Sequence, residues 1–153
     1  MSKFIYRMQN ILNLKEKLEE QAKMAYSTQL KVVADAEARK TELLSQRAYF
    51  EEVGIRLRLD DLDLLKIKEN KDDVRAMDDL IRAQEKVIRR ERIELEERRK
   101  RFEEVMKERK AQDKLKEHAF EQFLRDENAA ESKQIDELTS YKYGAAGKAI
   151  KKG

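Results

Sequence analysis

Proline is absent from this sequence, and glycine occurs only four times in 153 residues. A compact globular domain needs many turns, and turns depend largely on these two residue types. The abundant residues are instead Glu, Lys, Arg, Leu, Ala, Gln and Met, which are strong helix formers. The sequence therefore predicts an almost entirely helical chain.

Cysteine is also absent, which excludes disulfides, thiolate metal ligands and a thiol nucleophile. No apolar run approaches the roughly 20 residues that a membrane-spanning helix needs. The N-terminus lacks both the basic region and the uninterrupted apolar region of a secretory signal. We expect a mature protein of the cytoplasm.

Charge of one sign does not predominate, because 35 basic and 32 acidic side chains leave a net charge of only +3. The two signs are interspersed, which is typical of a solvated helix surface. The arginine-rich stretch at residues 87–110 is interrupted by glutamates at nearly every turn, and this favours ion pairs within a helix over a phosphate-binding stripe. RNA binding through this stretch is an alternative that predicts retention on nucleic acid and a steep loss of it as salt rises.

Mostly apolar residues in the first half recur at alternating spacings of three and four, as in the seam of a coiled coil. The expected seam comprises Ala22, Ala25, Gln29, Val32, Ala36, Arg39, Leu43, Gln46, Phe50, Val53 and Leu57. Upstream, Leu18, Leu14 and Ile11 continue the stripe with one extra residue inserted, a stutter that relaxes the supercoil.

A second seam follows in the other half of the chain. It comprises Met77, Ile81, Gln84, Ile88, Glu91, Leu95, Arg98, Phe102, Val105, Arg109, Gln112, Lys116, Ala119 and Phe123. Asp72 or Asp73 is expected to cap the start of this helix. Stripes of such length must bury each other or a partner.

Folding the chain back at Gly54 lets the two seams bury each other. We therefore predict an all-α protein, a long antiparallel two-helix coiled coil or helical hairpin over residues 1–143. Its parts are a helix at 3–53, a capped tip at 54–76 with a short helix from about Asp60, and a helix at 77–143. A flexible basic tail follows at 144–153. The expected register pairs Val53 with Met77, Leu43 with Ile88, Ala25 with Val105, and Met8 with Phe123.

The sequence offers no basis for catalysis, a cofactor or a metal site. Catalytic groups need a pocket that excludes water, and a two-helix hairpin has no such concavity. The single histidine, His118, cannot build a metal site of the usual kind. No glycine-rich nucleotide motif occurs, and paired carboxylates such as Glu96 and Glu97 are expected to face solvent. We expect a protein that is no enzyme and recognises partners through helix surfaces.

The two ends of the chain carry the most specific motifs. FIYRMQNILNLKEKLEEQAK at residues 4–23 combines aromatic residues, Arg, Met and Gln with Leu-Lys-Glu at residues 14–16, and AAESKQIDELTSYKYG closes the helical region at residues 129–144. With the long hairpin between them, these ends resemble the FliJ family, the small coiled-coil protein of the flagellar type III export apparatus.

The resemblance implies a protein similar to the central stalk of a rotary ATPase. It would couple the hexameric flagellar export ATPase to the cytoplasmic part of the membrane export gate and escort export chaperones, at the inner face of the membrane at the flagellar base. The paired terminal helices would enter the pore of the ATPase ring through Phe4, Ile5, Met8, Ile11, Leu12, Phe120, Phe123 and Leu124. The alternative is that these residues only close the open end of the coiled coil.

The resemblance also implies a contact with the export gate. In the family this contact uses a glutamine, aliphatic and tyrosine patch on the first helix and an aliphatic patch on the second. The corresponding residues are Gln46, Tyr49, Leu80, Gln84 and Val87, and the expected register brings Gln46 near Gln84. Leu80 replaces an expected aromatic residue, and Glu91 replaces an expected histidine.

Two other functions fit the same sequence pattern. One is a generic coiled-coil scaffold that forms homodimers through its seams, and the other is the equivalent stalk of a virulence type III secretion system. A dimer that resists dilution would favour the scaffold, whereas an extended monomer would favour the intramolecular hairpin.

Overall fold

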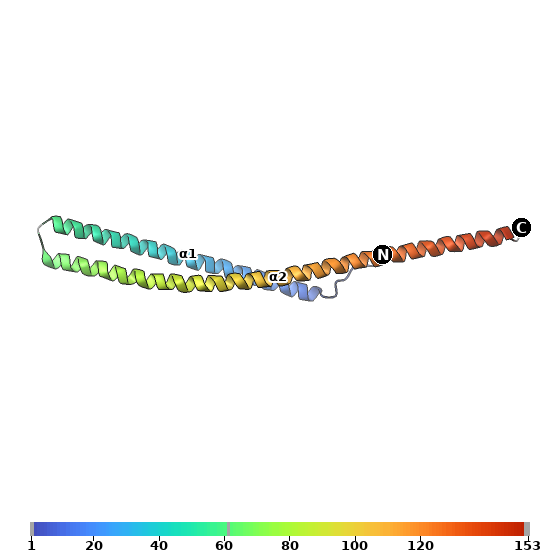
Figure 1. Cartoon of the computed structure of the whole chain (residues 1–153), viewed down its shortest axis with the longest axis horizontal. Helices are drawn as coiled ribbons and strands as arrows, with labels where there is room; N and C mark the ends of the chain where they lie inside the picture. Colours follow the sequence, from blue (N-terminus) through green and yellow to red (C-terminus); the bar gives the residue numbers. More distant parts are fainter. Residues whose placement is uncertain (1, 61, 152–153) are drawn as a thin grey trace. The chain divides into compact units, whose positions relative to one another are not determined.

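The structure, a computed structural model, describes residues 2–60 and 62–151, with side chains through residue 144. Two helices, α1 (Gln9–Leu59) and α2 (Leu64–Lys151), make up nearly all of this part, which contains no strand. The helices run antiparallel from the turn that joins them (Figure 1). The predicted all-α hairpin of two long packed helices is thereby confirmed.

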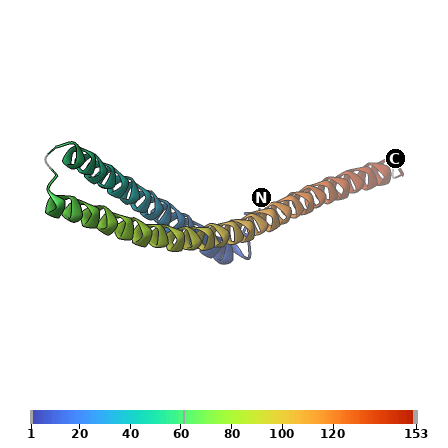
Figure 2. The same ribbon diagram turned by 60° about the vertical axis from the view of Figure 1, so that its left-hand side comes forward.

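The contacts within the chain define two units. The turn-side unit comprises residues 18–105 and includes the turn between α1 and α2. The terminal unit comprises residues up to 17 and from 106 onward, and so combines the start of the chain with the second half of α2. In the turn-side unit, α1 and α2 lie side by side in both views of the ribbon (Figures 1 and 2).

The turn between the helices is much shorter than the sequence suggested. Helix α1 continues through Gly54 to Leu59, and α2 already begins at Leu64, so the expected tip at 54–76 is almost entirely helical. Neither the separate short helix near Asp60 nor a cap at Asp72 or Asp73 is formed.

Asp63 caps α2 instead. Its carboxylate Oδ1 accepts hydrogen bonds from the backbone N–H groups of Leu65 (3.1 Å) and Lys66 (3.4 Å), and its carbonyl accepts one from Ile67 (3.1 Å). A side-chain cap of this kind stabilises a helix by about 1 kcal/mol. The turn therefore ends at Asp63, ahead of the capping residues Asp72 and Asp73 that the sequence suggested.

The seam of α2 was predicted correctly. Every expected residue from Met77 to Phe123 is buried or half-buried, and Met77, Ile81, Ile88 and Val105 are the most deeply buried. The same spacing continues toward the turn through Val74 and the buried Asn70.

The seam of α1 was right except at three positions. Eight expected residues are buried or half-buried, namely Ala22, Ala25, Gln29, Ala36, Leu43, Phe50, Val53 and Leu57, and Gly54 is buried beside Val53. Val32, Arg39 and Gln46 are exposed, and the next residues along the chain, Val33, Lys40 and Arg47, take their places in the seam. Lys40 and Arg47 can occupy seam positions because their methylene groups cover the interface while their charged ends pair with Glu85 and Asp78.

The expected register is wrong by about one heptad. Leu43 packs against Met77 and Ile81 and not against Ile88, and Arg98 donates to the carbonyl of Ala25, where Val105 was expected. A coiled-coil seam repeats every seven residues, so a slip of one heptad leaves apolar positions facing apolar positions. The position of the turn selects the register, and the observed turn between Leu59 and Leu64 lies earlier in the chain than the middle of the expected tip at 54–76.

Polar seam residues bridge the two helices through backbone carbonyls. Asn70 donates to Phe50 (2.7 Å), Gln84 to Ala36 (2.8 Å), Gln29 to Glu91 (2.9 Å) and Arg98 to Ala25 (3.0 Å). Among the described side chains, no buried polar atom lacks a hydrogen-bond partner. These bonds fit one register only, because a slip would carry each donor away from its carbonyl.

In the terminal unit, the start of the chain is packed but not helical. Helix α1 begins at Gln9 and not near Lys3, and Tyr6, which precedes it, is buried with its hydroxyl donating to Gln112 Oε1 (3.2 Å). Phe4 lies against Phe123, whereas the expected partner was Met8. Holding Phe4 and Tyr6 against α2 explains why the chain stays extended here.

The first turns of α1 contradict the expected stutter. Leu12 is buried, whereas Ile11 and Leu14 are exposed and Lys15 is half-buried. The buried positions of α1 therefore keep the alternating spacing of three and four from Leu12 onward, without an inserted residue. Lys15 and Gln9 reach across to Glu108 and Lys116, at 2.8 Å each.

The expected flexible tail is helical as far as the structure describes it. Helix α2 continues through Gly144 to Lys151. A Cβ atom added at Gly144 would have no described residue packed within 4 Å of it. Residues 152–153 of the expected tail lie outside the described residues, as does residue 61 of the expected tip. Alanine and lysine around Gly144 favour helix strongly enough to offset the glycine.

Candidate partner-binding surfaces

The residues expected to bind the export gate lie in the turn-side unit, and they differ in exposure. Tyr49 and Leu80 expose 62% and 50% of their surface, and Gln46 is exposed. Gln84 and Val87 are half-buried. Tyr49, Leu80 and Gln46 are therefore the members of the set that a partner could reach directly.

The structure does not bring Gln46 next to Gln84. Gln84 donates to the carbonyl of Ala36, which precedes Gln46 by ten residues, or about 15 Å along a helix. Gln46 is instead level with Leu80, because Leu43 packs on Ile81 and Arg47 pairs with Asp78 at 2.5 Å. The expected proximity of Gln46 and Gln84 is therefore wrong.

Tyr49 lines a groove between α1 and α2, which we call the Tyr49 groove. It has a volume of about 360 Å³ and is lined by Tyr49, Phe50, Val53, Leu57, Lys66, Glu69, Asn70 and Asp73. The rings of Tyr49 and Phe50 meet edge to face, with centroids 5.8 Å apart. Apolar side chains of α1 thus face one lysine and two carboxylates of α2, a combination that suits a partner with both apolar and basic groups.

The residues expected to enter the ATPase ring lie in the terminal unit. Phe4, Phe120 and Phe123 form an aromatic cluster, with the Phe4 centroid 5.1 Å from Phe120 and 5.4 Å from Phe123. Leu12 is only 2% exposed, so it belongs to the interface between the helices. The structure therefore separates Leu12, which closes the hairpin, from the rest of the set.

Five other members of that set are exposed apolar residues of the same unit, which together we call the collar, whereas Phe4 and Phe123 are half-buried. The collar comprises Ile5, Met8, Ile11, Phe120 and Leu124, of which Ile5 is the most exposed at 80%. Side chains of this size are ordinarily buried, and several of them exposed together in one unit mark an interaction surface.

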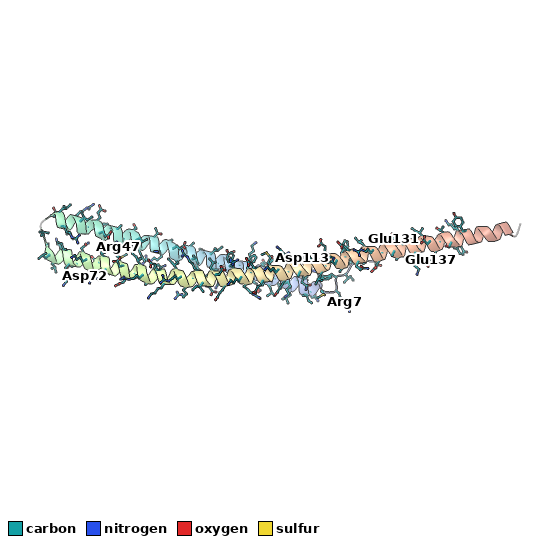
Figure 3. All side chains as sticks on the ribbon, in the orientation of Figure 1. Arg7, Arg47, Asp72, Asp113, Glu131 and Glu137 are labelled. Carbon is teal, nitrogen blue, oxygen red and sulfur yellow. The ribbon has the colours of Figure 1, made fainter. Side chains whose placement is uncertain are left out.

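Sequence analysis missed a second exposed set farther along α2. Residues 128–144 are exposed throughout, including Ile135, Leu138, Tyr141 and Tyr143. Figure 3 shows their neighbours Glu131 and Glu137 on this stretch of helix. Ile135, Leu138 and Tyr141 recur at spacings of three, which could have indicated an apolar stripe.

The arginine-rich stretch of α2 is occupied by ion pairs. Arg98 pairs with Glu94, Arg99 with both Glu96 and Glu103, and Arg92 with Glu37 of α1. The hydrogen bond from Arg99 lowers the pKa of Glu96, and the same bond raises the pKa of Arg99. This agrees with the prediction of intrahelical pairing in place of a phosphate-binding stripe.

In the part of the chain that the structure describes, no three His, Cys, Asp or Glu side chains gather where they could hold a metal ion. Neither helix contains an apolar window long enough to cross a bilayer, judged on the same residues.

Comparison with known proteins supplies the family. The family model described as "Flagellar FliJ protein" matches residues 3–148, which is nearly the whole chain. No curated protein and no solved structure gives a match. The matched range includes both terminal motifs, the collar and the Tyr49 groove. The chain therefore belongs to the FliJ family and is a component of flagellar protein export.

Proposed function

We propose that this protein is a stalk-like link that couples the hexameric export ATPase to the cytoplasmic part of the export gate. In this role it catalyses nothing itself and works in the cytoplasm, held at the inner face of the membrane through its partners. Export chaperones are further partners that it escorts. The observation that carries the proposal is the collar, because an apolar surface where the start of the chain packs against α2 suits insertion into the bore of a ring.

The collar and the Tyr49 groove supply the two contacts that coupling needs. The collar lies in the terminal unit and the Tyr49 groove in the turn-side unit, so one chain offers separate surfaces to two partners. We assign ring contact to Ile5, Met8, Ile11, Phe120 and Leu124, supported by Phe4 and Phe123. We assign gate contact to Tyr49, Gln46 and Leu80, with Gln84 and Val87 supporting the surface from its edge.

The ring contact is tested by adding the purified protein to the purified export ATPase and measuring ATP turnover. We expect stimulation by the wild type and loss of most of it in the double variant Ile5→Asp and Ile11→Asp. The matched control is Leu30→Asp with Ile93→Asp, because these two residues are also exposed but lie in the turn-side unit. An ATPase that responds equally to both variants, or to neither, would contradict the proposal.

The gate contact is tested with Tyr49→Ala and a soluble gate domain. We expect weaker binding to the domain with unchanged helicity and melting temperature, because Tyr49 is mostly exposed. Met24→Ala, at a residue that is 65% exposed, is the control that should bind normally. Loss of folding in Tyr49→Ala would place the residue in the structural core and remove it from the contact.

The homodimeric scaffold makes a different prediction. Its seams would be buried between chains, whereas here Leu43, Met77 and Ile81 pack within one chain. Sedimentation equilibrium separates the two functions: we expect a monomer over the accessible concentration range. The family match is to flagellar proteins, so the virulence counterpart is not proposed.

A further inference from the structure

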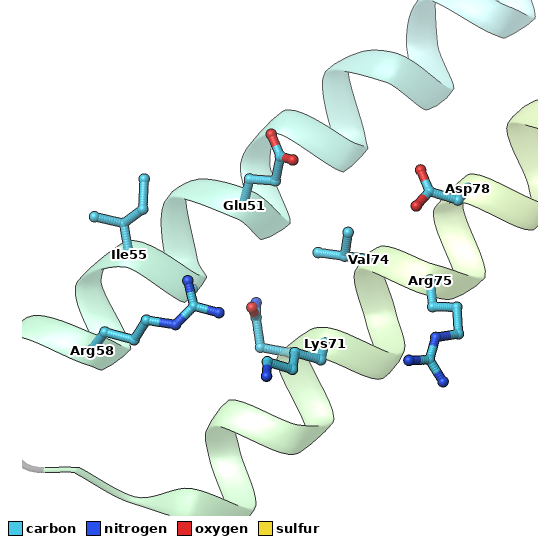
Figure 4. Close-up of a pocket in the computed structure, with 9 residues that line it drawn as sticks. Glu51, Ile55, Arg58, Lys71, Val74, Arg75 and Asp78 are labelled. Atoms are coloured by element: carbon cyan, nitrogen blue, oxygen red, sulfur yellow. The ribbon is translucent and has the colours of Figure 1, made fainter.

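A second groove lies on the other side of the seam, at the same level of the hairpin as the Tyr49 groove. We call it the Arg58 groove. It has a volume of about 550 Å³ and is lined by Glu51, Gly54, Ile55, Arg58, Asn70, Lys71, Val74, Arg75 and Asp78 (Figure 4). Tyr49 and Val53 precede the seam residues Phe50 and Gly54, whereas Glu51 and Ile55 follow them, so the two grooves flank the seam on opposite sides.

The floor of the Arg58 groove is small and apolar. Gly54 is buried, Val74 is half-buried, and Ile55 exposes 57% of its surface. In Figure 4, Val74 points between the helices. Asn70 fills the space beside Gly54, so Ile55 and Val74 are the apolar side chains of this floor on which an aliphatic side chain of a partner could pack.

The rim of the groove carries unpaired positive charge. Arg58 reaches from α1 toward α2, and Lys71 extends back toward it (Figure 4). No carboxylate of the described residues pairs with Arg58, Lys71 or Arg75. Two cations that face each other across a groove repel until an anion lies between them.

The two carboxylates of the same groove do not neutralise this rim. Arg47 holds both of them, Glu51 at 2.6 Å and Asp78 at 2.5 Å. The pKa of Arg47 is raised chiefly by its hydrogen bond to Asp78, so this guanidinium stays charged and engaged. The positive charge of Arg58 and Lys71 is therefore left for an external ligand.

Neighbouring grooves contain fewer unpaired cations. In the Tyr49 groove, Lys66 faces two carboxylates, Glu69 and Asp73. In a third groove, nearer the middle of the turn-side unit, Lys40 pairs with Glu85 and Arg92 with Glu37, which leaves Arg89 as its lining cation without an ion pair among the described residues. The Arg58 groove differs because three of its lining cations, Arg58, Lys71 and Arg75, have no described carboxylate as a partner.

We propose that the Arg58 groove is a docking site for an acidic, amphipathic segment of a partner protein. Carboxylates of that segment bind Arg58 and Lys71, and an aliphatic side chain packs on Ile55 and Val74. A protein segment fits better than a lipid surface, because the groove is concave and the exposed carboxylates of Asp60 and Asp63 lie at the turn beside it. This inference does not depend on the ring and gate contacts proposed above, which use other residues.

The probe for this site is a fluorescent amphipathic peptide that carries leucines on one helical face and glutamates beside them. Fluorescence anisotropy with the full chain should show saturable binding, weakened by salt because the contacts are ionic. A peptide with lysines in place of the glutamates should not bind. Amide signals of Gly54 and Val74 should shift on titration, whereas those of Tyr49 and Leu57 should not.

The deciding variant is Arg58→Glu with Lys71→Glu. Both side chains are exposed, so the fold should be kept, and affinity for the acidic peptide should fall roughly tenfold or more. The matched control is Lys66→Glu with Lys68→Glu, which makes the same charge change at the same end of the hairpin. This control should keep an affinity within about twofold of the wild type.

Several results would overturn the proposal. One is no binding of the acidic peptide, and another is an equal loss of affinity in both double variants, which would mean non-specific attraction. Co-sedimentation with phosphatidylserine vesicles, without peptide binding, would assign the groove to lipid. A dimer in sedimentation that Arg58→Glu with Lys71→Glu dissociates would make the groove a contact between copies of this chain.

Discussion

The turn-side unit joins its two helices differently near the turn and farther from it. Near the turn, Leu43, Met77 and Ile81 form a buried apolar cluster with Phe50 against it. Farther away, polar side chains join buried apolar residues such as Val105 in the seam: Gln29 donates to both the carbonyl and the carboxylate of Glu91, and Arg98 donates to the carbonyl of Ala25.

These two kinds of contact do different work. An apolar cluster supplies stability, but it tolerates a slip of one heptad because another apolar residue then takes the same place. A hydrogen bond to one particular carbonyl supplies little net stability and is lost on any slip. We infer that the region near the turn holds the helices together and that the polar region keeps them in register.

The largest effect is expected from Leu43→Ala. Leu43 is only 3% exposed, and truncation of a buried leucine leaves a cavity that costs about 2–5 kcal/mol. Urea denaturation of the full chain measures the change. Leu44→Ala is the control. The Leu44 side chain is 46% exposed, so its truncation should lower the free energy of unfolding by less than about 1 kcal/mol. Equal losses would mean that the apolar cluster is not the main source of stability.

Gly54→Ala should have a smaller effect on stability, and it should destabilise the protein although helix propensity alone predicts stabilisation. Propensity alone would favour alanine by about 1 kcal/mol. The new Cβ would, however, lie 2.4 Å from Oδ1 of Asn70, and displacing this buried side chain breaks its bond to Phe50. We expect a net destabilisation of roughly 1–3 kcal/mol, measured by thermal unfolding.

A double variant supplies the control for this prediction. Adding Asn70→Ala removes the side chain that the new methyl group would meet. Gly54→Ala should then be less harmful in the Asn70→Ala background than in the wild type, and this difference is the coupling between the two residues. Additive effects would show that the close approach of Gly54 and Asn70 does not matter.

Gln29→Leu should change the register more than the stability. Replacing a buried polar residue by an apolar one of similar size should leave the free energy of unfolding within about 1 kcal/mol. Spin labels at the exposed positions Ser27 and Ile93 should then give a broader distance distribution than in the wild type. Gln21→Leu, at an exposed position, is the control. A single narrow distance in Gln29→Leu would contradict the assigned role of the polar region.

The smallest effect is expected from surface ion pairs on α2. The hydrogen bond from Arg99 lowers the folded-state pKa of Glu96 below its ordinary value of 4.5. Such a group adds stability above the unfolded-state pKa and loses it as the pH falls through the folded-state pKa. Glu96→Gln should therefore lower the melting temperature slightly near neutral pH and not at strongly acid pH. The same loss at both would assign the effect to packing.

The candidate surfaces could be predicted only in part from the sequence. The resemblance to a family pointed to the collar and to Tyr49, and those residues are exposed in the structure apart from Leu12, Phe4 and Phe123. The Arg58 groove could not be found in this way. Its residues are ordinary surface types in the sequence, and they matter only because Arg47 removes the two carboxylates that would otherwise neutralise them.

The seams show why some features are readable and others are not. The α2 seam followed from the apolar period alone, since few alternatives compete with Met77, Ile81 and Ile88. In α1, apolar or long side chains stand at adjacent positions such as Val32 and Val33, so the period fits two neighbouring frames. Salt bridges from Lys40 and Arg47 to α2 decide which of the two sets of positions faces the other helix. The α1 sequence alone does not contain this information, because the acidic partners belong to α2.

Helix propensity and apolar period act within a few residues of each other, and for that reason the amino-acid order was sufficient for the all-α class, two long helices and the buried face of α2. The position of the turn, the heptad register and the frame of α1 were settled only when the helices met. Asp63 capping α2, Asn70 fitting against Gly54 and the cross-helix hydrogen bonds join residues far apart in the chain, and a repeating pattern cannot choose among registers that differ by one repeat.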